Sequence, residues 1–412
     1  MLRFLKDVLV GTEEERRIAE ELTSHFAPQK RPAEHPRGID VQVSGDEMIL
    51  NMGPQHPSTH GVLRLQLVTD GEVVRQVIPH IGYMHRCFEK HAESLPYEEI
   101  IPFTDRVDYL AAMNQNLAYA LAVEKLMGIT VPERVEYIRV IMCELNRIAS
   151  HLVALGTYGL DIGAFTPFLW AFRDREKILD LLEWVSGARM LYAYIWIGGL
   201  ARDLPPGWVE KAMEFVDYFE PKIDELNDLL SFNKIFIERT ADVGVIDAET
   251  AINCGITGPN LRACGVQWDL RRDDPYSIYD RFEFAIPVGS DEHGPLGSCW
   301  NRYMVRVWEM KESLKILRQA LPAIPPGDVK EAIPRRVRPP KGEVYVRTET
   351  PRGELGFYII SDGSGTPFRV KCRAPSFCNI SAIDAMLSEG TMIADLVAIV
   401  GSIDIVLCDI DR

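Results

Sequence analysis

The spacing of apolar residues changes period twice along the chain. Between residues 41 and 83 apolar and polar residues alternate, as in MILNMG, VLRLQLV and EVVRQVIPHIGY, which predicts a small antiparallel sheet. From 84 to 232 apolar residues recur at helical spacing over four long segments, which predicts a helical bundle. Alternation returns in GEVYVRTE, GELGFYIIS and PFRVKCRA, and a second antiparallel sheet is expected there.

Glycine and proline set the expected ends of the helices, because glycine favours the helix stop and proline the first turn. Residues 233–298 are rich in Gly, Pro and Asp and predict loops with short strands. The expected helices are 105–127, capped by Asp105 and ended by Gly128; 132–155, ended by Gly156; 170–194; one from Trp208 that Pro221 should kink or divide; and 300–321.

Together these patterns predict one integrated α+β fold, a central helical bundle flanked by small antiparallel sheets. Residues 1–40, helix-permissive over 13–25, are expected to form an N-terminal extension. The expected parts after it are the sheet of 41–83 with a binding loop, the bundle of 84–232, and a region of loops, long helix and sheet over 233–412.

Composition narrows the classes of function. The net charge of −15 and the pI near 5.2 argue against a nucleic-acid binder, which needs a basic face. No apolar run reaches the roughly 18 to 20 residues of a membrane helix, and the best, 190–200, is too short. The amino terminus lacks the pattern of a secretory or mitochondrial leader, which indicates either the cytoplasm of a bacterium or a chain that has been processed. The eight cysteines include no C-x-x-C pair, so free thiols are expected.

The segment NMGPQHPSTHG carries His56 and His60 four residues apart. Pro54 and Pro57 exclude a helix, so a tight loop is expected whose imidazoles and hydroxyls suit a carbonyl or hydroxyl ligand. Histidines satisfied by backbone groups are an equally good interpretation. Five of the nine histidines lie between residues 56 and 91, yet no H-E-x-x-H or similar ligand spacing is present, and no metal is expected.

Charged residues also stand within the apolar helical region. Arg86 and Glu89 are three apart and should form a salt bridge. Glu144, Arg147 and His151 share one face of an otherwise apolar helix, so they must be paired if buried, and a structural ion network is expected. Such networks can also store or conduct protons.

Asp161 lies in the apolar segment GLDIGAFTPF, which is expected to be a loop just past the second helix of the bundle. Burial there would raise its pKa and make it a candidate proton donor or acceptor. A capping or turn role fits the local sequence equally well.

Seven segments together carry a resemblance to a known family: GPQHPSTHGVLR, HIGYMHRCFEK, DRVDYLAAM, ELNRIASHL, LDIGAFTPF, RGELGFYIISDG and VKCRAPSFCN. In order and spacing, from about residue 48 to 412, the chain resembles the quinone-site subunit of respiratory complex I, the NuoD type. The resemblance implies a fold like that of the large subunit of nickel-iron hydrogenases. It also implies a catalytic subunit of a proton-translocating NADH:quinone oxidoreductase.

The resemblance further implies roles for single residues. His60 and Tyr109 would hydrogen-bond the quinone headgroup, and Asp161 would pair with the histidine in proton coupling. Arg86 would lie beside a 4Fe-4S cluster held by an adjacent NuoB-type subunit. The implied partners are the NuoB, NuoC and NuoI types and the membrane-embedded NuoH type, at the cytoplasmic face of the cell's inner membrane, with NAD and iron-sulfur clusters in partner subunits.

Two further implications come from positions at which this chain differs from the related proteins. The two cysteine pairs that hold nickel in the hydrogenases are missing, from DRVDYLAAM and from SIDIVLCDIDR, so no bound metal is expected and the vacated cavity would admit quinone. Cys87, Leu191 and Trp196 replace the family's usual glycine, histidine and arginine. Losing a cation and an imidazole near a cluster should lower the reduction potential of that cluster, which favours menaquinone over ubiquinone.

Two alternative functions remain to be weighed. The missing cysteine pairs disfavour a hydrogenase large subunit. The retained trio of His60, Tyr109 and Asp161 disfavours a structural scaffold.

Overall fold

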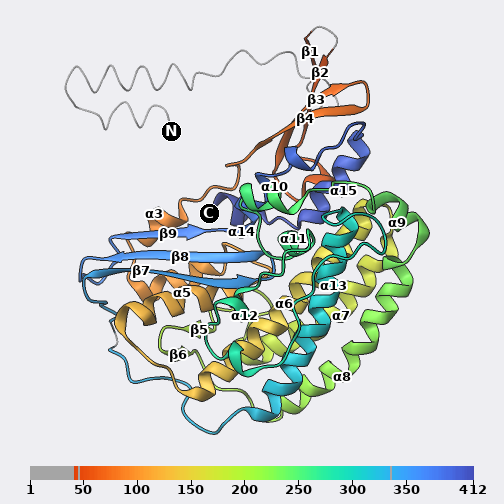
Figure 1. Ribbon diagram of the computed structural model, residues 1–412. Helices are drawn as coiled ribbons and strands as arrows, with labels where there is room; N and C mark the ends of the chain where they lie inside the picture. The colour runs from red at the N-terminus through yellow and green to blue at the C-terminus, as the bar shows by residue number, and fades with distance from the viewer. Residues whose placement is uncertain (1–40, 45–46, 335) are drawn as a thin grey trace, which may run out of the picture.

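A computed structural model describes residues 41–44, 47–334 and 336–412. The expected extension over 1–40, with its helix at 13–25, lies outside the described residues. Four long helices pack side by side in the body of the molecule (Figure 1). They are α6 (Glu133–Asp161), α7 (Phe165–Ser186), α8 (Trp208–Leu226) and α13 (Cys299–Ala320).

The predicted N-terminal sheet is present and antiparallel, in the order β1 (Val41–Ser44), β2 (Glu47–Met52), β3 (Arg64–Asp70) and β4 (Val73–His80). Strand β3 alternates between buried and half-buried residues, as a sheet with one covered face requires. The sheet stands at the top of the molecule in Figure 1, and its buried Leu65 and Leu67 join the main apolar core.

The predicted C-terminal sheet is also present, formed by β7 (Gly342–Thr350), β8 (Gly353–Ser361) and β9 (Arg369–Arg373). Helix α5 (Ala112–Met127) packs against β7 and β8 on one side and against α6 on the other. Leu355, Phe357 and Ile359 on β8 are fully buried in this layer. The α+β class, with helices flanked by two small antiparallel sheets, is therefore confirmed. The division into parts over 1–40, 41–83, 84–232 and 233–412 stays a prediction.

Several predicted helix ends were wrong. Asp105 does not cap α5, which begins at Ala112; its buried carboxylate instead accepts a hydrogen bond from Ala193 N at 2.8 Å. Gly156 does not end α6, because the helix continues to Asp161 and the missing side chain lets α7 approach. A Cβ at Gly156 would lie 3.1 Å from Ala171 Cβ. Gly128, by contrast, ends α5 in the left-handed conformation as predicted.

Other predicted elements have different bounds in the structure or are of a different type. Helix α7 covers 165–186 rather than 170–194, and α8 continues through Pro221 without being divided. The segment 233–298, all of it described, forms short helices and loops rather than strands. The last 40 residues contain three helices that the pattern did not predict. The shorter helices are α3 (Phe88–Ala92), α4 (Ile101–Thr104), α9 (Lys234–Thr240), α10 (Ala248–Asn253), α11 (Pro259–Arg262), α12 (Leu270–Asp273), α14 (Pro375–Ile380), α15 (Ile393–Ile403) and α16 (Leu407–Asp411).

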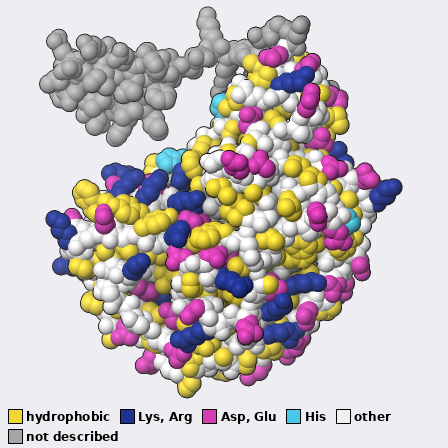
Figure 2. All heavy atoms as spheres, viewed as in Figure 1, with side chains coloured by type: hydrophobic (Ala, Val, Ile, Leu, Met, Phe, Trp, Pro, Cys, Tyr) yellow, Lys and Arg dark blue, Asp and Glu magenta, His cyan; other side chains and the backbone are white. Residues whose placement is uncertain are grey.

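The remaining elements are single turns and one small hairpin. The hairpin joins β5 (Ile195–Trp196) to β6 (Gly199–Leu200). The turns are η1 (Pro57–Thr59), η2 (Tyr97–Ile100), η3 (Asn227–Ser231), η4 (Tyr279–Arg281), η5 (Leu321–Ala323) and η6 (Asp384–Met386). Within the described residues, no helix is both long enough and apolar enough to cross a bilayer. Acidic and basic side chains are interspersed over the face shown in Figure 2.

Candidate active site

A cavity of about 520 Å³ lies where the loop after β2 meets the end of α6 and the end of α15. His60, Tyr109 and Asp161, three residues far apart in the sequence, all line this cavity. Its wall is completed by Pro57, Ser58, Gly61, Leu110, Val153, Thr157, Leu160, Asp404, Ile405 and Val406. One hollow therefore holds an imidazole, a phenol and two carboxylates within a largely apolar wall.

The loop that carries His60 is held by its own backbone and side chains. His56 Nδ1 accepts a hydrogen bond from Ser58 N at 3.2 Å, and Thr59 Oγ1 donates to His56 O at 2.7 Å. Thr59 is fully buried, which anchors the turn, and His60 follows in the left-handed conformation with φ 54°. The predicted tight loop is thus confirmed. His56 is satisfied locally, whereas His60 points to a partner elsewhere in the chain.

That partner is Asp161, the last residue of α6 rather than a loop residue as predicted. His60 Nε2 and Asp161 Oδ2 are 2.6 Å apart, and the two side chains are 19% and 11% exposed. Burial alone would lower the pKa of His60. The hydrogen bond to Asp161 and the attraction of the Asp161 and Asp404 carboxylates outweigh burial and raise the pKa of His60 above its ordinary value.

Tyr109 lies in the turn between α4 and α5, half-buried beside the His60–Asp161 pair. Burial raises the pKa of its phenol, which therefore stays protonated at neutral pH and can donate a hydrogen bond. Its hydroxyl makes no hydrogen bond to any other described residue. The phenol is thus free to bind a ligand in the cavity.

Asp404 gave no signal in the sequence patterns, although it lines the same cavity. It caps α15 in the left-handed conformation, and its Oδ1 accepts a hydrogen bond from Arg352 Nη2 at 3.3 Å. The only local hint was an aspartate directly after the apolar run of α15. The segments 105–113 and 402–412, where the resemblance places the lost cysteine pairs, both line this cavity, through Tyr109 and Asp404 respectively.

Arg86 lies apart from this cavity, at a second hollow of about 320 Å³ beside Cys408 and Arg412. It is exposed, and it forms no ion pair with any residue that the structure describes. The predicted Arg86–Glu89 salt bridge was wrong. Glu89 instead binds Arg369 at 3.0 Å and Lys371 at 2.8 Å on β9, because α3 packs against that strand.

The charged face of α6 is fully buried, and each of its three residues has an ionic partner, as predicted for a structural ion network, although Arg147 Nη1 and His151 Nδ1 make no hydrogen bond to any described residue. Glu144 accepts hydrogen bonds from Arg271 Nη1 at 3.2 Å and from Tyr279 OH at 2.8 Å, and it also faces Arg147. His151 Nε2 lies 2.8 Å from Glu309 Oε2. These partners come from α12, η4 and α13, and the other members of the network are Arg262 at the end of α11, Asp269 before α12 and Glu349 on β7.

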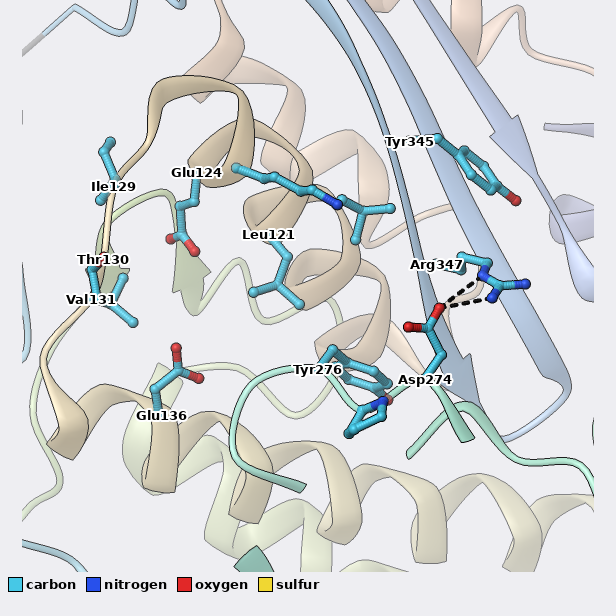
Figure 3. Close-up of a pocket in the computed structure, with 13 residues that line it drawn as sticks. Leu121, Glu124, Ile129, Thr130, Val131, Glu136, Asp274, Tyr276, Tyr345 and Arg347 are labelled. Carbon is cyan, nitrogen blue, oxygen red and sulfur yellow. Dashed lines mark hydrogen bonds and ion pairs between the residues drawn. The ribbon is translucent and has the colours of Figure 1, made fainter. Parts of the chain in front are cut away.

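A third hollow, of about 370 Å³, lies between α5, the start of α6 and β7 (Figure 3). Glu124 and Glu136 face it from the two helices, and Arg347 Nη2 pairs with Asp274 Oδ2 at 2.8 Å along its rim. None of the predicted site residues lines this hollow. We therefore place the candidate site in the cavity of His60 and not here.

No group of three or more His, Cys, Asp or Glu residues in the described part of the chain is arranged to hold a metal ion. The eight cysteines are all free. Cys87 adopts φ 56°, a conformation that favours glycine, which is the residue that the resemblance leads one to expect at that position.

Comparison with known proteins gives one consistent answer. The family model described as respiratory-chain NADH dehydrogenase, 49 kDa subunit, matches residues 161–339 and 330–412. The D-type subunit of the NADH-quinone oxidoreductase of Chlorobium luteolum is 58% identical over 378 residues, 91% of this chain and 95% of the relative. A D-type subunit of the same enzyme in Cytophaga hutchinsonii is 57% identical over 388 residues, 92% of this chain and 99% of the relative. This chain therefore belongs to the family of the 49 kDa, or D-type, subunit of respiratory-chain NADH dehydrogenases.

Proposed function

We propose that this chain forms the site at which a quinone is reduced in a proton-translocating NADH:quinone oxidoreductase. The observation that carries the proposal is the cavity of about 520 Å³ in which His60, Asp161 and Tyr109 converge. Reduction of a quinone to a quinol consumes two electrons and two protons. A site for it must therefore offer two proton donors to the ring oxygens and an apolar wall to the ring.

The residues supply these features in distinct ways. His60 carries a proton more readily than a free imidazole because Asp161 stabilises its charged form, so it can hydrogen-bond and protonate one ring oxygen. Tyr109 keeps its phenolic proton through burial and can serve the other oxygen. Leu110, Ile405 and Val406 provide apolar contact. Asp161 holds the imidazole in orientation and compensates its charge.

The electrons would come from outside this chain. In the proposal a NuoB-type subunit holds a 4Fe-4S cluster near Arg86, whose exposed guanidinium has no carboxylate partner among the described residues and can face a negatively charged cluster. NuoC, NuoI and membrane-embedded NuoH types complete the surroundings, and NAD is bound by partner subunits. The chain would then sit at the cytoplasmic face of the inner membrane, held there by the membrane subunits.

For the substrate we favour menaquinone over ubiquinone. Leu191 and Trp196 bring neither a titrating imidazole nor a cation to the region where the resemblance places the cluster, which should lower the cluster's potential and weaken its pH dependence. Trp196 Nε1 donates to Ala193 O at 2.6 Å, so its indole is occupied locally. A redox titration of the cluster in the assembled complex tests this, and an ordinary pH slope of the midpoint would refute it.

The buried network of Glu144, Arg147 and His151 has a structural role in this proposal. The network contains four buried carboxylates, three buried arginines and one buried histidine. The carboxylates are Glu144, Asp269, Glu309 and Glu349, and their partners are Arg147, Arg262, Arg271 and His151. Such an arrangement fixes α6, α12, α13 and β7 relative to one another, since breaking any one pair would leave a buried charge alone. It thereby holds the end of α6, and with it Asp161, in place.

The test uses the assembled complex with Tyr109→Phe and His60→Ala. Each variant should lower NADH:quinone activity at least tenfold, because one proton donor is lost. Reduction of an artificial acceptor at the flavin end should persist, since it does not use this cavity. Equal loss of both activities would indicate an assembly defect, whereas full quinone activity in both variants would reject the proposal. Nickel analysis of the purified complex separates it from a hydrogenase-like role.

A further inference from the structure

Asp404 lines the active-site cavity, and one of its two carboxylate oxygens lacks a hydrogen bond. The Asp404 side chain is 8% exposed, and its Oδ1 is bound by Arg352. Its Oδ2 is buried and accepts no hydrogen bond from any described residue; Arg306 Nε is 3.7 Å away. Because a buried carboxylate oxygen without a donor is costly, this atom is suited to a proton or to a ligand.

Asp404 belongs to a cluster that has more acids than bases. Arg352 Nη1 binds Asp108 Oδ2 at 2.7 Å, and Arg352 and Arg306 are the two arginines that face the cluster. Asp409, from α16, is fully buried, with Oδ2 accepting from Ser376 N at 2.9 Å, and it is close enough for its charge to act on Arg352 and Asp108 without forming an ion pair with either arginine. Three buried carboxyl groups therefore lie near two guanidinium groups, and two of the three, Asp108 and Asp404, are in ion pairs with them.

An uncompensated buried carboxylate is unfavourable, so one of the three acids is expected to hold a proton. Burial, then the negative charge of Asp108, raises the pKa of Asp409 to about 7, in keeping with a shared proton. The neighbouring charges do not remove the excess. Glu309, which faces Arg306 from the same helix, is itself paired with Arg262 and His151.

The carboxylate cluster adjoins both proton donors of the cavity, Tyr109 and His60. Asp404 lines the hollow together with Tyr109 and His60, and its charge acts on the pKa of both groups. Asp108 is the direct chain neighbour of Tyr109. His60 already has Asp161 as its partner, whereas Tyr109 has no hydrogen-bonded partner among the described residues. Asp404 is therefore the carboxylate of this cavity that is left to serve the phenol.

We propose that Asp404 is a proton-relay residue, which returns to Tyr109 the proton that the phenol gives to the reduced ring and draws it from the proton shared with Asp108 and Asp409. This rests on the proposed quinone function. The ring receives two electrons from the partner subunit's iron-sulfur cluster, one proton from His60 and one from Tyr109. The O–H bond of the protonated acid then breaks as that of Tyr109 re-forms. Arg352 and Arg306 stabilise the resulting carboxylate, and the cluster and His60 each regain one proton from bulk water in each turnover.

The test is Asp404→Asn in the assembled complex, because the amide keeps the shape but cannot carry the proton. We expect kcat for quinone reduction to fall at least tenfold at pH 8 and to recover in part at pH 6, where protons from water are more abundant. KM for the quinone should change less than threefold, and artificial-acceptor activity should be unchanged. Asp404→Glu should retain most of the activity. Asp224→Asn, at an exposed ion pair with Lys311, is the matched control.

A second variant tests the relay if the Asp404→Asn complex does not assemble. Asp409→Asn mimics the neutral acid without an exchangeable proton, so it should give the same loss at pH 8 and the same recovery at pH 6. The relay is overturned if the variants that assemble keep more than half of the wild-type kcat with an unchanged pH profile, or if only KM rises. Those results would leave the proposed function intact as long as Tyr109→Phe and His60→Ala remain impaired; its own failure would show in those two variants instead.

Discussion

The imidazole Nε2 of His60 and the carboxylate Oδ2 of Asp161 lie 2.6 Å apart, although 101 residues separate them in the sequence. His60 is fixed by the anchored turn after β2, and Asp161 by the last turn of the long helix α6. The pair thus joins the N-terminal sheet to the helical body at the cavity. Its electrostatic consequence, a raised pKa at His60, can be measured.

Replacing Asp161 with asparagine should move the pH profile of quinone reduction. The protonated form of His60 is the proton donor, so activity should fall as pH rises through the pKa of His60. Without the Asp161 charge that pKa drops, and the fall should begin at lower pH, with kcat/KM at pH 8 at least tenfold below wild type. Asp180→Asn at an exposed ion pair is the control. An unshifted alkaline limb would contradict the role of the pair.

Gly401 on α15 should be intolerant of a side chain because of its place against the pair. A Cβ there would lie 2.9 Å from Asp161 Oδ2 and 2.7 Å from Tyr158 Cδ2. Gly401→Ala would ordinarily favour the helix by about 1 kcal/mol. Here we expect a loss of about 1 to 3 kcal/mol in stability from overpacking, with a fall in quinone activity as Asp161 is displaced. Denaturant unfolding of the full chain and turnover of the complex check both, and a more stable, fully active variant would contradict the contact.

The ion pair of Glu124 and Arg139 should contribute far more to stability than a surface pair. Two hydrogen bonds of 2.6 and 3.0 Å join them, the side chains are 5% and 0% exposed, and Glu124 also accepts from Gly198 N. Glu124→Ala leaves a buried guanidinium alone and should cost about 3 to 5 kcal/mol. The same change at exposed Glu214, which pairs with Lys211, should cost less than about 1 kcal/mol. Comparable losses in urea unfolding would refute this ranking.

Asp105 should make the protein less stable as pH rises. Burial raises the pKa of its carboxyl to about 6, so the folded state binds the proton more tightly than the unfolded state does. Its contribution to stability is present below the unfolded pKa near 4 and is lost as pH rises toward 6. Asp105→Asn, which can keep the bond from Ala193 N, should gain about 1 to 3 kcal/mol relative to wild type between pH 4 and pH 7. Urea unfolding at several pH values measures it, and parallel curves would contradict it.

Local sequence predicted the elements whose causes are local. Alternation placed β2 to β4 and β7 to β9, because one buried face imposes a period of two. Gly128 ended α5 through its own backbone freedom, and the prolines around His56 enforced a turn whatever the surroundings. Gly156 misled the prediction because glycine is also used where two helices touch, and only the position of α7 reveals that use.

The residues of the candidate site likewise fall into those that the local sequence pattern predicted and those that it did not. Pattern alone identified the histidine loop and the charged face of α6, while the resemblance of the whole chain supplied the pairing of His60 with Asp161 and the role of Tyr109. Asp404 and Arg352 gave no usable signal, since one aspartate after an apolar run or one arginine in a turn is ordinary. The places where strands, turns and most helices form follow from the order of the amino acids, because hydrophobic period and backbone preference act over a few residues. Which charges pair with one another depends on the folded arrangement. Burial removes water as a partner, so each ionised group must find its counter-charge among side chains that come from distant parts of the chain.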